Sequence, residues 1–415
     1  MEIRPFKALR PAPNLASKVA CLPYDVMNTE EAAKMTEGNP YSFLHVIRSE
    51  IDLPQVSNQY DQQVYEKAQK NLHNMVKNQT LIQDQTPSFY LYRQCMNGRQ
   101  QLGIVACHSI DDYESGLIKK HEFTRPEKEN DRIRHFDQCD AHTEPVFLTY
   151  RSEANFTRLI RQYAEENEPV YDFATEDGIQ HTLWHISSSE WVQKIADTFQ
   201  KNVEVLYIAD GHHRTASAAK IGFKRRKENP DLDINDESQF LMAVSFPQED
   251  LYCMEYNRVV KDLNGMSVDE LLARVSQHFE CEPVDKAYQP KEKHEFGMLL
   301  NNHWYRLIAK PHTFSENDVI QQLDVSILQN YLLQPILGIM DPRTDKRIDF
   351  VGGIRGIEEL ERRVQNDMKL AFSMFPTTIE DLLQVADEDK IMPPKSTWFE
   401  PKLRSGIFLH PFKEY

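Results

Sequence analysis

The chain has 415 residues, and its 48 lysines and arginines against 64 aspartates and glutamates give a formal net charge of −16 at pH 7. This length suits two or three packed domains, and a content of 40% hydrophobic and 27% charged residues excludes a mainly disordered or fibrous chain. Because the negative charge repels phosphate backbones and anionic membrane surfaces, we expect neither nucleic acid nor a membrane as a partner.

The cysteines and the N-terminus bear on the cellular location. The six cysteines stand at positions 21, 95, 107, 139, 253 and 281, so no two form a CxxC pair, and we interpret them as reduced thiols. The N-terminus, MEIRPFKALRPAP, has charges and prolines where a signal peptide has an apolar core. No apolar run approaches the roughly 20 residues of a membrane span. These features predict a cytoplasmic protein.

In the first half of the chain, one helix and two hairpins are predicted. Residues 58–78 place apolar side chains at three- and four-residue spacing, which predicts an amphipathic helix. The pair Asn97-Gly98 lies between two β-prone runs, and Asp177-Gly178 lies between two more. Residues of these types tolerate positive φ, so each pair predicts the turn of a β-hairpin.

Further along, strands and helices alternate. Residues 203–209 (VEVLYIA) form a short apolar run, which predicts a buried strand. Helices are predicted over 188–201 and over 267–279, where Ser267 and Glu270 have the spacing of a capping box.

The remaining segments continue this alternation and suggest one boundary. The polar stretch 224–238 is expected to be a surface loop, and a boundary between two halves is placed near 261–268. HWYRLIAKP (303–311) is expected as a strand, followed by a helix that Asp324 caps. The segments RIDFVGG, GIEELERRVQN, KLAFSMFP and TTIEDLLQVADED then alternate between strand and helix. This mixture predicts an α+β protein with a mixed sheet.

The sharpest candidate for a functional site is Asp210-Gly211-His212-His213-Arg214, where an apolar strand runs into an alanine-rich helix. A helix N-terminus presents unpaired N–H groups and the positive end of the helix dipole, and glycine lets the backbone approach a ligand. We interpret this turn as an anion site in which Asp210 holds a metal-bound water or orients a histidine. The alternative, in which Asp210 caps the helix and the next residues are ordinary surface groups, stays open. A zinc site is disfavoured because adjacent histidines point in different directions.

A second candidate cluster runs from Lys119 to Glu127 and continues with Asn130, Asp131, Arg132 and Arg134. In it, Glu122 follows an apolar segment and is surrounded by cations. Such a carboxylate can act as a general base while arginines neutralise phosphate charge. The alternative is a solvated charge run that opens a helix, and composition alone favours this second interpretation.

Four segments resemble a known family: LPYDV (22–26), HEFTRPEK (121–128), ADGHHRTASA (209–218) and PPKSTWFEPKLRSGIF (393–408). They resemble the DUF1015 family, historically of unknown function, over nearly the whole chain. Within that family, the HE pair followed by DGHHR resembles the signature of the free-serine kinases with a ParB/sulfiredoxin-like fold. Those kinases use a nucleoside phosphate and Mg²⁺ to convert free L-serine into O-phosphoserine.

The resemblance implies roles for particular residues. Glu122 corresponds to the glutamate that activates the serine hydroxyl, and with Asp210 and His213 it forms the expected catalytic set. The expected nucleotide-binding residues are Gly211, His212, His213, Arg214 and Thr215, and Asp210 is the expected Mg²⁺ ligand. From the residues themselves, further candidates for the substrate are Tyr24, Asp25, Arg125, Arg258, Lys395, Ser396, Thr397 and Trp398, because a polar run beside Pro393-Pro394 is rigid and can reach a cleft. The alternative, in which they are structural loop residues, stays open.

This sequence departs from the kinase pattern in two places. The residues between Glu122 and Asp210 number 87, more than in the compact kinases, and Leu22 stands where the usual motif has a proline. ParB relatives bind CTP and DNA, but the net charge of −16 argues against DNA here.

The resemblance predicts an organisation and a function. The expected organisation is an N-terminal α/β segment over 1–100, a ParB/sulfiredoxin-like catalytic core with an insertion over 101–262, and a C-terminal α/β domain over 263–415. The expected function is transfer of a phosphoryl group from ATP or ADP, with Mg²⁺, to the hydroxyl of free L-serine or a close analogue. The alternatives are a phosphohydrolase or nucleotidase, and a non-catalytic nucleotide sensor. The donor nucleotide, the amino acid and the oligomeric state are left open.

Overall fold

The computed structural model describes residues 1–56 and 58–415, which divide into two compact units. The first unit comprises Met1–Lys119, Thr124–Leu251 and Pro401–Tyr415, and the second comprises Lys120–Phe123 and Tyr252–Glu400. This division differs from the predicted one. Residues 1–100 and most of 101–262 share one unit, because the strand over 89–96 pairs with the strand over 99–109, which runs through the predicted boundary at residue 100. The chain also returns to that unit at its end.

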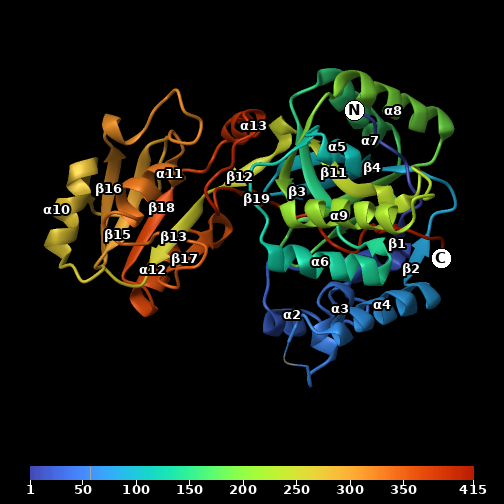
Figure 1. Ribbon diagram of the computed structural model, residues 1–415, viewed down its shortest axis with the longest axis horizontal. Helices are drawn as coiled ribbons and strands as arrows, with labels where there is room; N and C mark the ends of the chain where they lie inside the picture. Colours follow the sequence, from blue (N-terminus) through green and yellow to red (C-terminus); the bar gives the residue numbers. More distant parts are fainter. Residues whose placement is uncertain (57) are drawn as a thin grey trace. The chain divides into compact units, whose positions relative to one another are not determined.

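The first unit is built on an eight-stranded sheet with the order β5-β10-β7-β11-β4-β3-β9-β8, of which Figure 1 labels β11, β4 and β3. β5 runs parallel to β10 and β7 parallel to β11, while the other neighbours are antiparallel. The predicted mixed sheet is therefore confirmed, and with it the α+β class. The strand bounds are β3 (Phe89–Met96), β4 (Arg99–Ser109), β5 (Ile118–Lys119), β7 (Val146–Tyr150), β8 (Tyr171–Ala174), β9 (Gln180–Ile186), β10 (Leu206–Asp210) and β11 (Phe240–Pro247).

Both predicted hairpins are confirmed. β3 and β4 pair across Asn97 and Gly98, whose φ angles are 52° and 80°. β8 and β9 pair across a turn in which Gly178 has a φ of 78°. These left-handed conformations explain why Asn-Gly and Asp-Gly mark the turns.

Helices surround the first sheet, and the predicted helices near 58–78 and 188–201 are present as α4 and α8. α9 continues to Glu228, so the expectation of a loop from residue 224 is wrong for its first five residues. They stay helical because Lys224 and Arg225 form ion pairs with Asp137 of α6. The helices are α1 (Ala16–Val19), α2 (Thr29–Met35), α3 (Leu44–Ile47), α4 (Gln62–Lys77), α5 (Ile110–Glu114), α6 (Pro126–Cys139), α7 (Ala154–Glu166), α8 (Ser189–Asn202) and α9 (His212–Glu228), and the short strands are β1 (Leu9–Pro11), β2 (Leu81–Gln83), β6 (Ala141–His142) and β20 (His410–Pro411).

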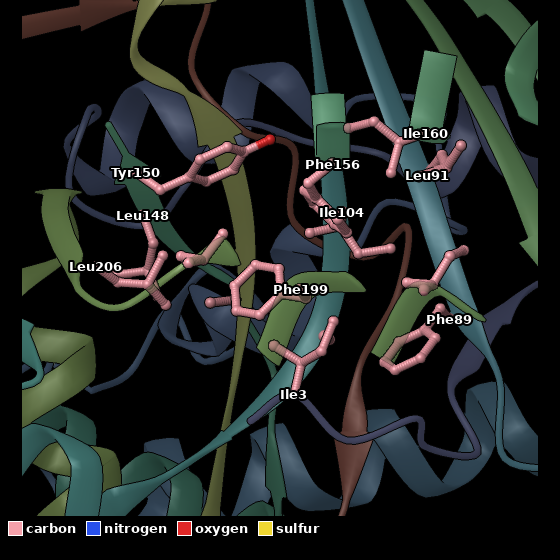
Figure 2. Packing of buried hydrophobic residues seen from close by; sticks show 14 of the residues in the cluster. Ile3, Phe89, Leu91, Ile104, Leu148, Tyr150, Phe156, Ile160, Phe199 and Leu206 are labelled. Atoms are coloured by element: carbon pink, nitrogen blue, oxygen red, sulfur yellow. The ribbon is translucent and has the colours of Figure 1, made fainter. Parts of the chain in front are cut away.

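A large apolar core fixes β10 (Figure 2). Leu206 and Ile208 of β10 belong to one buried cluster with Phe156 of α7 and Phe199 of α8. The Phe156 and Phe199 rings meet edge to face, with centroids 5.0 Å apart. Burying one such side chain contributes about 1.5–3 kcal/mol. The buried strand predicted over 203–209 is therefore present, but it begins later, at Leu206, and ends at Asp210, and the core holds in place the turn that follows it.

The second unit contains a six-stranded antiparallel sheet with the order β14-β16-β15-β18-β13-β17. The capping box of Ser267 and Glu270 is confirmed at the start of α10. Asp324 does not cap its helix as expected, because its carboxylate instead accepts a hydrogen bond from the backbone N–H of His294 at 2.8 Å. The elements are β12 (Tyr252–Met254), β13 (Tyr256–Val260), α10 (Val268–His278), β14 (Phe279–Val284), β15 (Glu295–Leu300), β16 (His303–Ala309), α11 (Asp324–Leu328), β17 (Ile348–Gly352), α12 (Glu358–Asn366), β18 (Leu370–Met374), α13 (Ile379–Asp387) and β19 (Trp398–Glu400).

No helix among the described residues combines the length and the apolar character that crossing a membrane requires.

Candidate active site

The turn after β10 is a strand-to-helix junction that requires glycine. Gly211 is the N-cap residue of α9 and has a φ of 94°, in the left-handed region that favours glycine. A Cβ atom at this position would also lie only 3.0–3.1 Å from the Arg214 guanidinium. Both the backbone conformation and the close packing therefore disfavour any residue larger than glycine at position 211. Asp210 is the last residue of β10, directly before this turn.

Asp210 is an ionised carboxylate between two cations. Its Oδ1 accepts the backbone N–H of Gly211 at 2.8 Å, and its Oδ2 accepts Lys402 Nζ at 3.2 Å and lies 3.9 Å from Arg214 Nη2. Burial raises the pKa of Asp210, but Lys402 and Arg214 outweigh burial and hold this pKa well below its usual value. The sequence analysis did not single out Lys402, although it lies in the segment 393–408 that carries part of the family resemblance.

Arg214 lies beneath the turn. It is only 3% exposed, and Nη1 donates to the carbonyl of Pro145 at 2.5 Å. The neighbouring Thr215 hydroxyl donates to the carbonyl of Gly211 at 3.0 Å. In this arrangement both side chains stabilise the turn, and their predicted contact with nucleotide phosphates stays a prediction.

His213 joins the turn to the start of α6. Its Nε2 accepts the backbone N–H of Arg125 at 3.0 Å, which assigns the ring proton to Nδ1. Burial lowers the pKa of His213 to about 4, although Asp25 acts in the opposite direction. His213 is therefore neutral at pH 7, and it offers Nδ1–H as a hydrogen-bond donor rather than a positive charge.

The N-terminal motif segment is brought to the same place. The backbone N–H of Tyr24 donates to Glu144 Oε1 at 3.2 Å, and the Arg132 guanidinium covers the Tyr24 ring at 3.8 Å. The next residue, Asp25, is exposed, and its charge acts on both His213 and Arg214. Asp25 therefore acts electrostatically on a turn that lies more than 180 residues further along the chain, and its role in substrate binding stays a prediction.

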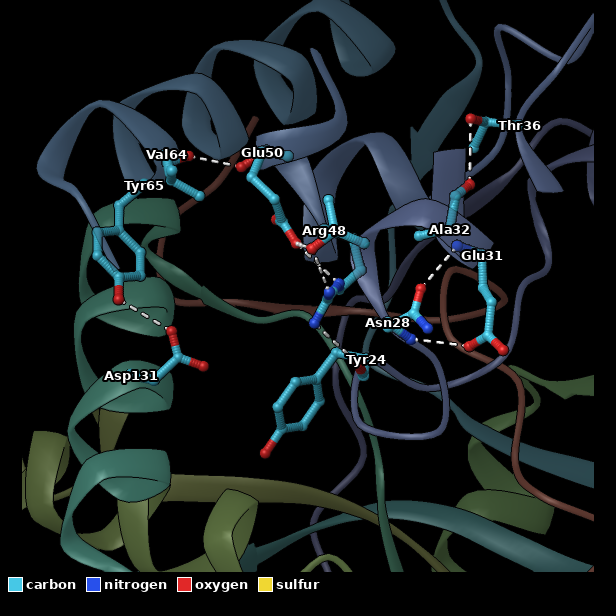
Figure 3. A network of polar contacts seen from close by, with 12 residues as sticks. Tyr24, Asn28, Glu31, Ala32, Thr36, Arg48, Glu50, Val64, Tyr65 and Asp131 are labelled. Atoms are coloured by element: carbon cyan, nitrogen blue, oxygen red, sulfur yellow. Dashed lines mark hydrogen bonds and ion pairs between the residues drawn. The ribbon is translucent and has the colours of Figure 1, made fainter. Parts of the chain in front are cut away.

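A buried ionic network supports Tyr24. Arg132 bonds to Asp131 at 2.9 Å and to Glu144 at 3.0 Å. Tyr65 donates to Asp131 at 2.9 Å, a contact that Figure 3 shows. Burial lowers the pKa of Arg132, but the opposite effect of Asp131 and Glu144 is larger. The pKa is therefore raised above its usual value, and the guanidinium stays charged. Glu144 is 1% exposed and also accepts the Ser405 hydroxyl at 3.1 Å. No local sequence pattern marks Glu144, so it was not among the predicted site residues.

Two helix N-termini meet in this region. α6 begins after Arg125 and α9 after Gly211, and in the described part of the chain neither N-cap position is capped by its own side chain. The hydrogen bond from Arg125 to His213 brings the two helix starts together. Each start carries the positive end of a helix dipole, and the exposed Arg125 side chain and the half-buried Lys128 add charge. This part of the first unit suits an anion.

The remaining predicted site residues belong to the second unit. Glu122 lies in the segment Lys120–Phe123 of that unit. In this segment, the carbonyl of His121 accepts the backbone N–H of Met392 at 2.9 Å, and His121 Nε2 lies 3.5 Å from Thr397 Oγ1. The substrate candidates Arg258, Lys395, Ser396, Thr397 and Trp398 are in the second unit too. Glu122 and the 210–214 turn belong to different units, and the approach of one to the other stays a prediction.

The predicted Mg²⁺ ligand is a poor match as it stands. Mg²⁺ prefers several oxygen ligands in near-octahedral geometry. Asp210 instead has Lys402 and Arg214 on its carboxylate, so Mg²⁺ would have to replace Lys402. The carboxylate of Asp210 therefore does not fit a resident Mg²⁺ while Lys402 and Arg214 occupy it.

The protein belongs to a known family. The profile of the DUF1015 family, described as "protein of unknown function", matches residues 3–326 of the chain. This range includes the LPYDV, HEFTRPEK and ADGHHRTASA segments. No curated protein matches the sequence.

Several solved structures are similar to the chain. A mutant free serine kinase in complex with AMP is 12% identical, with 71% of this chain and 87% of that chain covered and a TM-score of 0.37. SbnI with a C-terminal truncation from Staphylococcus aureus is 9% identical, with 72% and 85% covered and a TM-score of 0.39. A conserved hypothetical protein from Pyrococcus furiosus is 14% identical, with 72% and 93% covered and a TM-score of 0.37. At these TM-scores, none of the three defines the activity of this chain.

We expect Arg214→Ala to destabilise the first unit by about 3 kcal/mol, because the substitution leaves a buried carbonyl unpaired and takes one cation from Asp210. Urea unfolding measures the loss. Lys227→Ala, at an exposed position of the same helix, is the control and should cost less than about 1 kcal/mol. Unchanged stability combined with weaker nucleotide binding would show that Arg214 contacts the ligand directly.

Proposed function

We propose that the protein is a nucleotide-dependent kinase that phosphorylates the hydroxyl of free L-serine or a close analogue. The observation that carries this proposal is the hydrogen bond that joins the start of α6 to the DGHHR turn at the start of α9, where Asp25 of the LPYD segment acts electrostatically on His213 and Arg214. Catalysis of phosphoryl transfer depends mainly on positioned cations and hydrogen-bond donors, together with a group that accepts the hydroxyl proton. The first unit supplies the donors and cations, and we assign the nucleotide phosphates to it. We further propose that its core has the ParB/sulfiredoxin-like fold.

The topology supports a role for Glu122 despite the 87 intervening residues. β5 pairs in parallel with β10, with Lys119 opposite Tyr207. Glu122 follows Lys119 by three residues and Asp210 follows Tyr207 by three residues. Both motifs therefore follow the carboxyl ends of adjacent parallel strands, where ligands commonly bind in α/β sheets. Three residues of chain span at most about 10 Å, so Glu122 stays near the end of β5.

In the proposed reaction, Glu122 accepts the proton of the serine hydroxyl while the hydroxyl oxygen of serine attacks the terminal phosphorus of the nucleotide. The new bond joins the serine oxygen to that phosphorus, and the bond from phosphorus to the bridging oxygen breaks, so ATP leaves as ADP or ADP leaves as AMP. His213 is neutral and donates a hydrogen bond through Nδ1, while the N–H groups at the start of α9 face the phosphates.

Phosphorus NMR with and without L-serine tests the proposal. We expect a new O-phosphoserine signal that appears only when nucleotide and L-serine are both present, with ATP and ADP compared as donors. Homoserine and threonine in the same panel define the acceptor. Release of inorganic phosphate at the same rate without serine would instead identify a phosphohydrolase, and binding without turnover would identify a nucleotide sensor.

A further inference from the structure

Arg258 of β13 is a buried cation without a counter-ion. It is 3% exposed, and it donates to the backbone carbonyl of Tyr256 and, at 2.9 Å, to that of Lys395. In residues 1–56 and 58–415 no carboxylate forms an ion pair with it. Burial lowers the pKa of Arg258 to about 10, so it still carries its charge at pH 7. Burying an unpaired charge is costly.

The other buried arginines show how unusual this is. Each has a carboxylate partner: Glu50 for Arg48, Asp131 and Glu144 for Arg132, Asp210 for Arg214, and Asp177 for Arg404. The fold therefore pairs buried guanidinium groups as a rule. The missing anion at Arg258 suggests that a ligand supplies it.

A second cation lies beside Arg258 on a fixed loop. Lys395 has a φ of 61°, a left-handed conformation that a lysine rarely adopts. The loop is held by hydrogen bonds from the Ser396 hydroxyl to the carbonyl of Pro393 at 2.6 Å and from the Thr377 hydroxyl to the carbonyl of Ser396 at 2.7 Å. The Lys395 ammonium lies 5.4 Å from the centroid of the Tyr256 ring and has no carboxylate partner among the described residues.

Aromatic rings surround this pair of cations. The Tyr256 ring centroid lies 5.0 Å from that of Trp398 and 5.8 Å from that of Phe350, and the Arg258 guanidinium lies 5.5 Å from the Phe350 ring. Rings of this kind displace water, which strengthens the attraction between a guanidinium and an anion. The arrangement suits a small anion with an apolar or compact body.

We propose that Arg258 and Lys395 bind the carboxylate of the acceptor amino acid, an assignment that rests on the proposed function. A guanidinium pairs with a planar carboxylate through two parallel hydrogen bonds. The single positive charge of the buried Arg258 matches the single negative charge of a carboxylate. The di- or triphosphate of a nucleotide carries more charge than these two residues balance. The loop of Lys395 also contacts the residue before Glu122, since Met392 and Thr397 both bond to His121. The second unit thus carries both the acceptor and its base.

Isothermal titration of the full chain, with and without AMP, tests this assignment. The ligands are L-serine, L-serinamide, which lacks the negative charge, and inorganic phosphate. We expect Arg258→Met to bind L-serine about 10- to 100-fold more weakly and L-serinamide as the wild type does. Lys395→Gln, at an exposed position, should weaken L-serine binding severalfold without any risk to folding. Arg362→Met, an exposed arginine already paired with Glu359, is the control and should change nothing.

Arg258→Met also takes the hydrogen-bond donor from the carbonyls of Tyr256 and Lys395, so some loss of melting temperature is expected, and Lys395→Gln keeps the binding test independent of that loss. Unchanged L-serine affinity in both variants overturns the proposal, as does the absence of L-serine binding to the wild type. Phosphate binding that is tighter than L-serine binding and depends on Arg258 overturns the carboxylate assignment. Because the titration needs no turnover, Arg258-dependent L-serine binding by a protein that makes no O-phosphoserine would reject the kinase function and keep the subsite.

Discussion

Glu122→Gln is expected to lower kcat for serine phosphorylation by about 100- to 10,000-fold, the usual contribution of a general base. Glutamine keeps the shape and the hydrogen-bonding capacity of the side chain, but it cannot take the hydroxyl proton. Because the nucleotide phosphates are assigned to the first unit, the Kd for ADP should change by less than about threefold. Steady-state kinetics at saturating serine and nucleotide, together with nucleotide titration, separates the two effects.

Glu127→Gln is the matched control, since Glu127 is an exposed glutamate of the same charged run, in the first turn of α6. It should keep kcat within about twofold of the wild-type value. If Glu122→Gln retains full activity, the second cluster is a solvated charge run, and the kinase assignment loses its base.

The sequence predicted the local features of the first unit because they depend on neighbouring residues. β10 could be recognised as a short apolar run, and the turn at Gly211 follows from the glycine between an aspartate and two histidines. The hairpins at Gly98 and Gly178 follow from turn residues that tolerate positive φ. In each case the signal spans fewer than about ten residues of sequence.

The parts that could not be predicted depend on contacts between distant segments. Lys402 meets Asp210 across 192 positions, and Ser405 meets Glu144 across 261 positions. Neither pair leaves a periodic or spaced pattern in the sequence. The return of residues 401–415 to the first unit is of the same kind, and it explains why predicted boundaries drawn from local composition differ from the observed division.

Buried histidines make the first unit sensitive to acid. His108, His135, His142 and His181 are each no more than 2% exposed. Burial lowers the pKa of His108, His135 and His181 to about 3 and that of His142 well below its usual value. An unfolded histidine has a pKa of about 6.5, so the unfolded chain binds more protons than the folded one once the pH falls below that value. Stability therefore decreases from about pH 6.5 downward.

We expect the first unit to lose about 2 kcal/mol of unfolding free energy per buried histidine between pH 7 and pH 5, or about 8 kcal/mol for the four. Some carboxylates of the first unit have lowered pKa values, among them Asp131 and Asp210. Their protonation reduces the unfolding free energy only below about pH 4, so it does not affect the range from pH 7 to pH 5. The second unit contains a group of opposite sign. Burial raises the pKa of Asp324 to about 7, so the folded form takes up a proton over this range and gains about 2 kcal/mol.

Hydrogen exchange at pH 7 and pH 5, corrected for intrinsic rates, resolves the two units. Protection of β3, β4 and β11 should fall steeply at pH 5, while protection of β15 and β18 should fall less or rise. His108→Leu removes one buried titrating group, so it should reduce the loss of unfolding free energy of the first unit between pH 7 and pH 5 by about 2 kcal/mol. His73→Gln replaces an exposed histidine and should leave that dependence unchanged. If the first unit is equally protected at both pH values, the buried rings take up protons without unfolding, and burial does not set their pKa values as inferred.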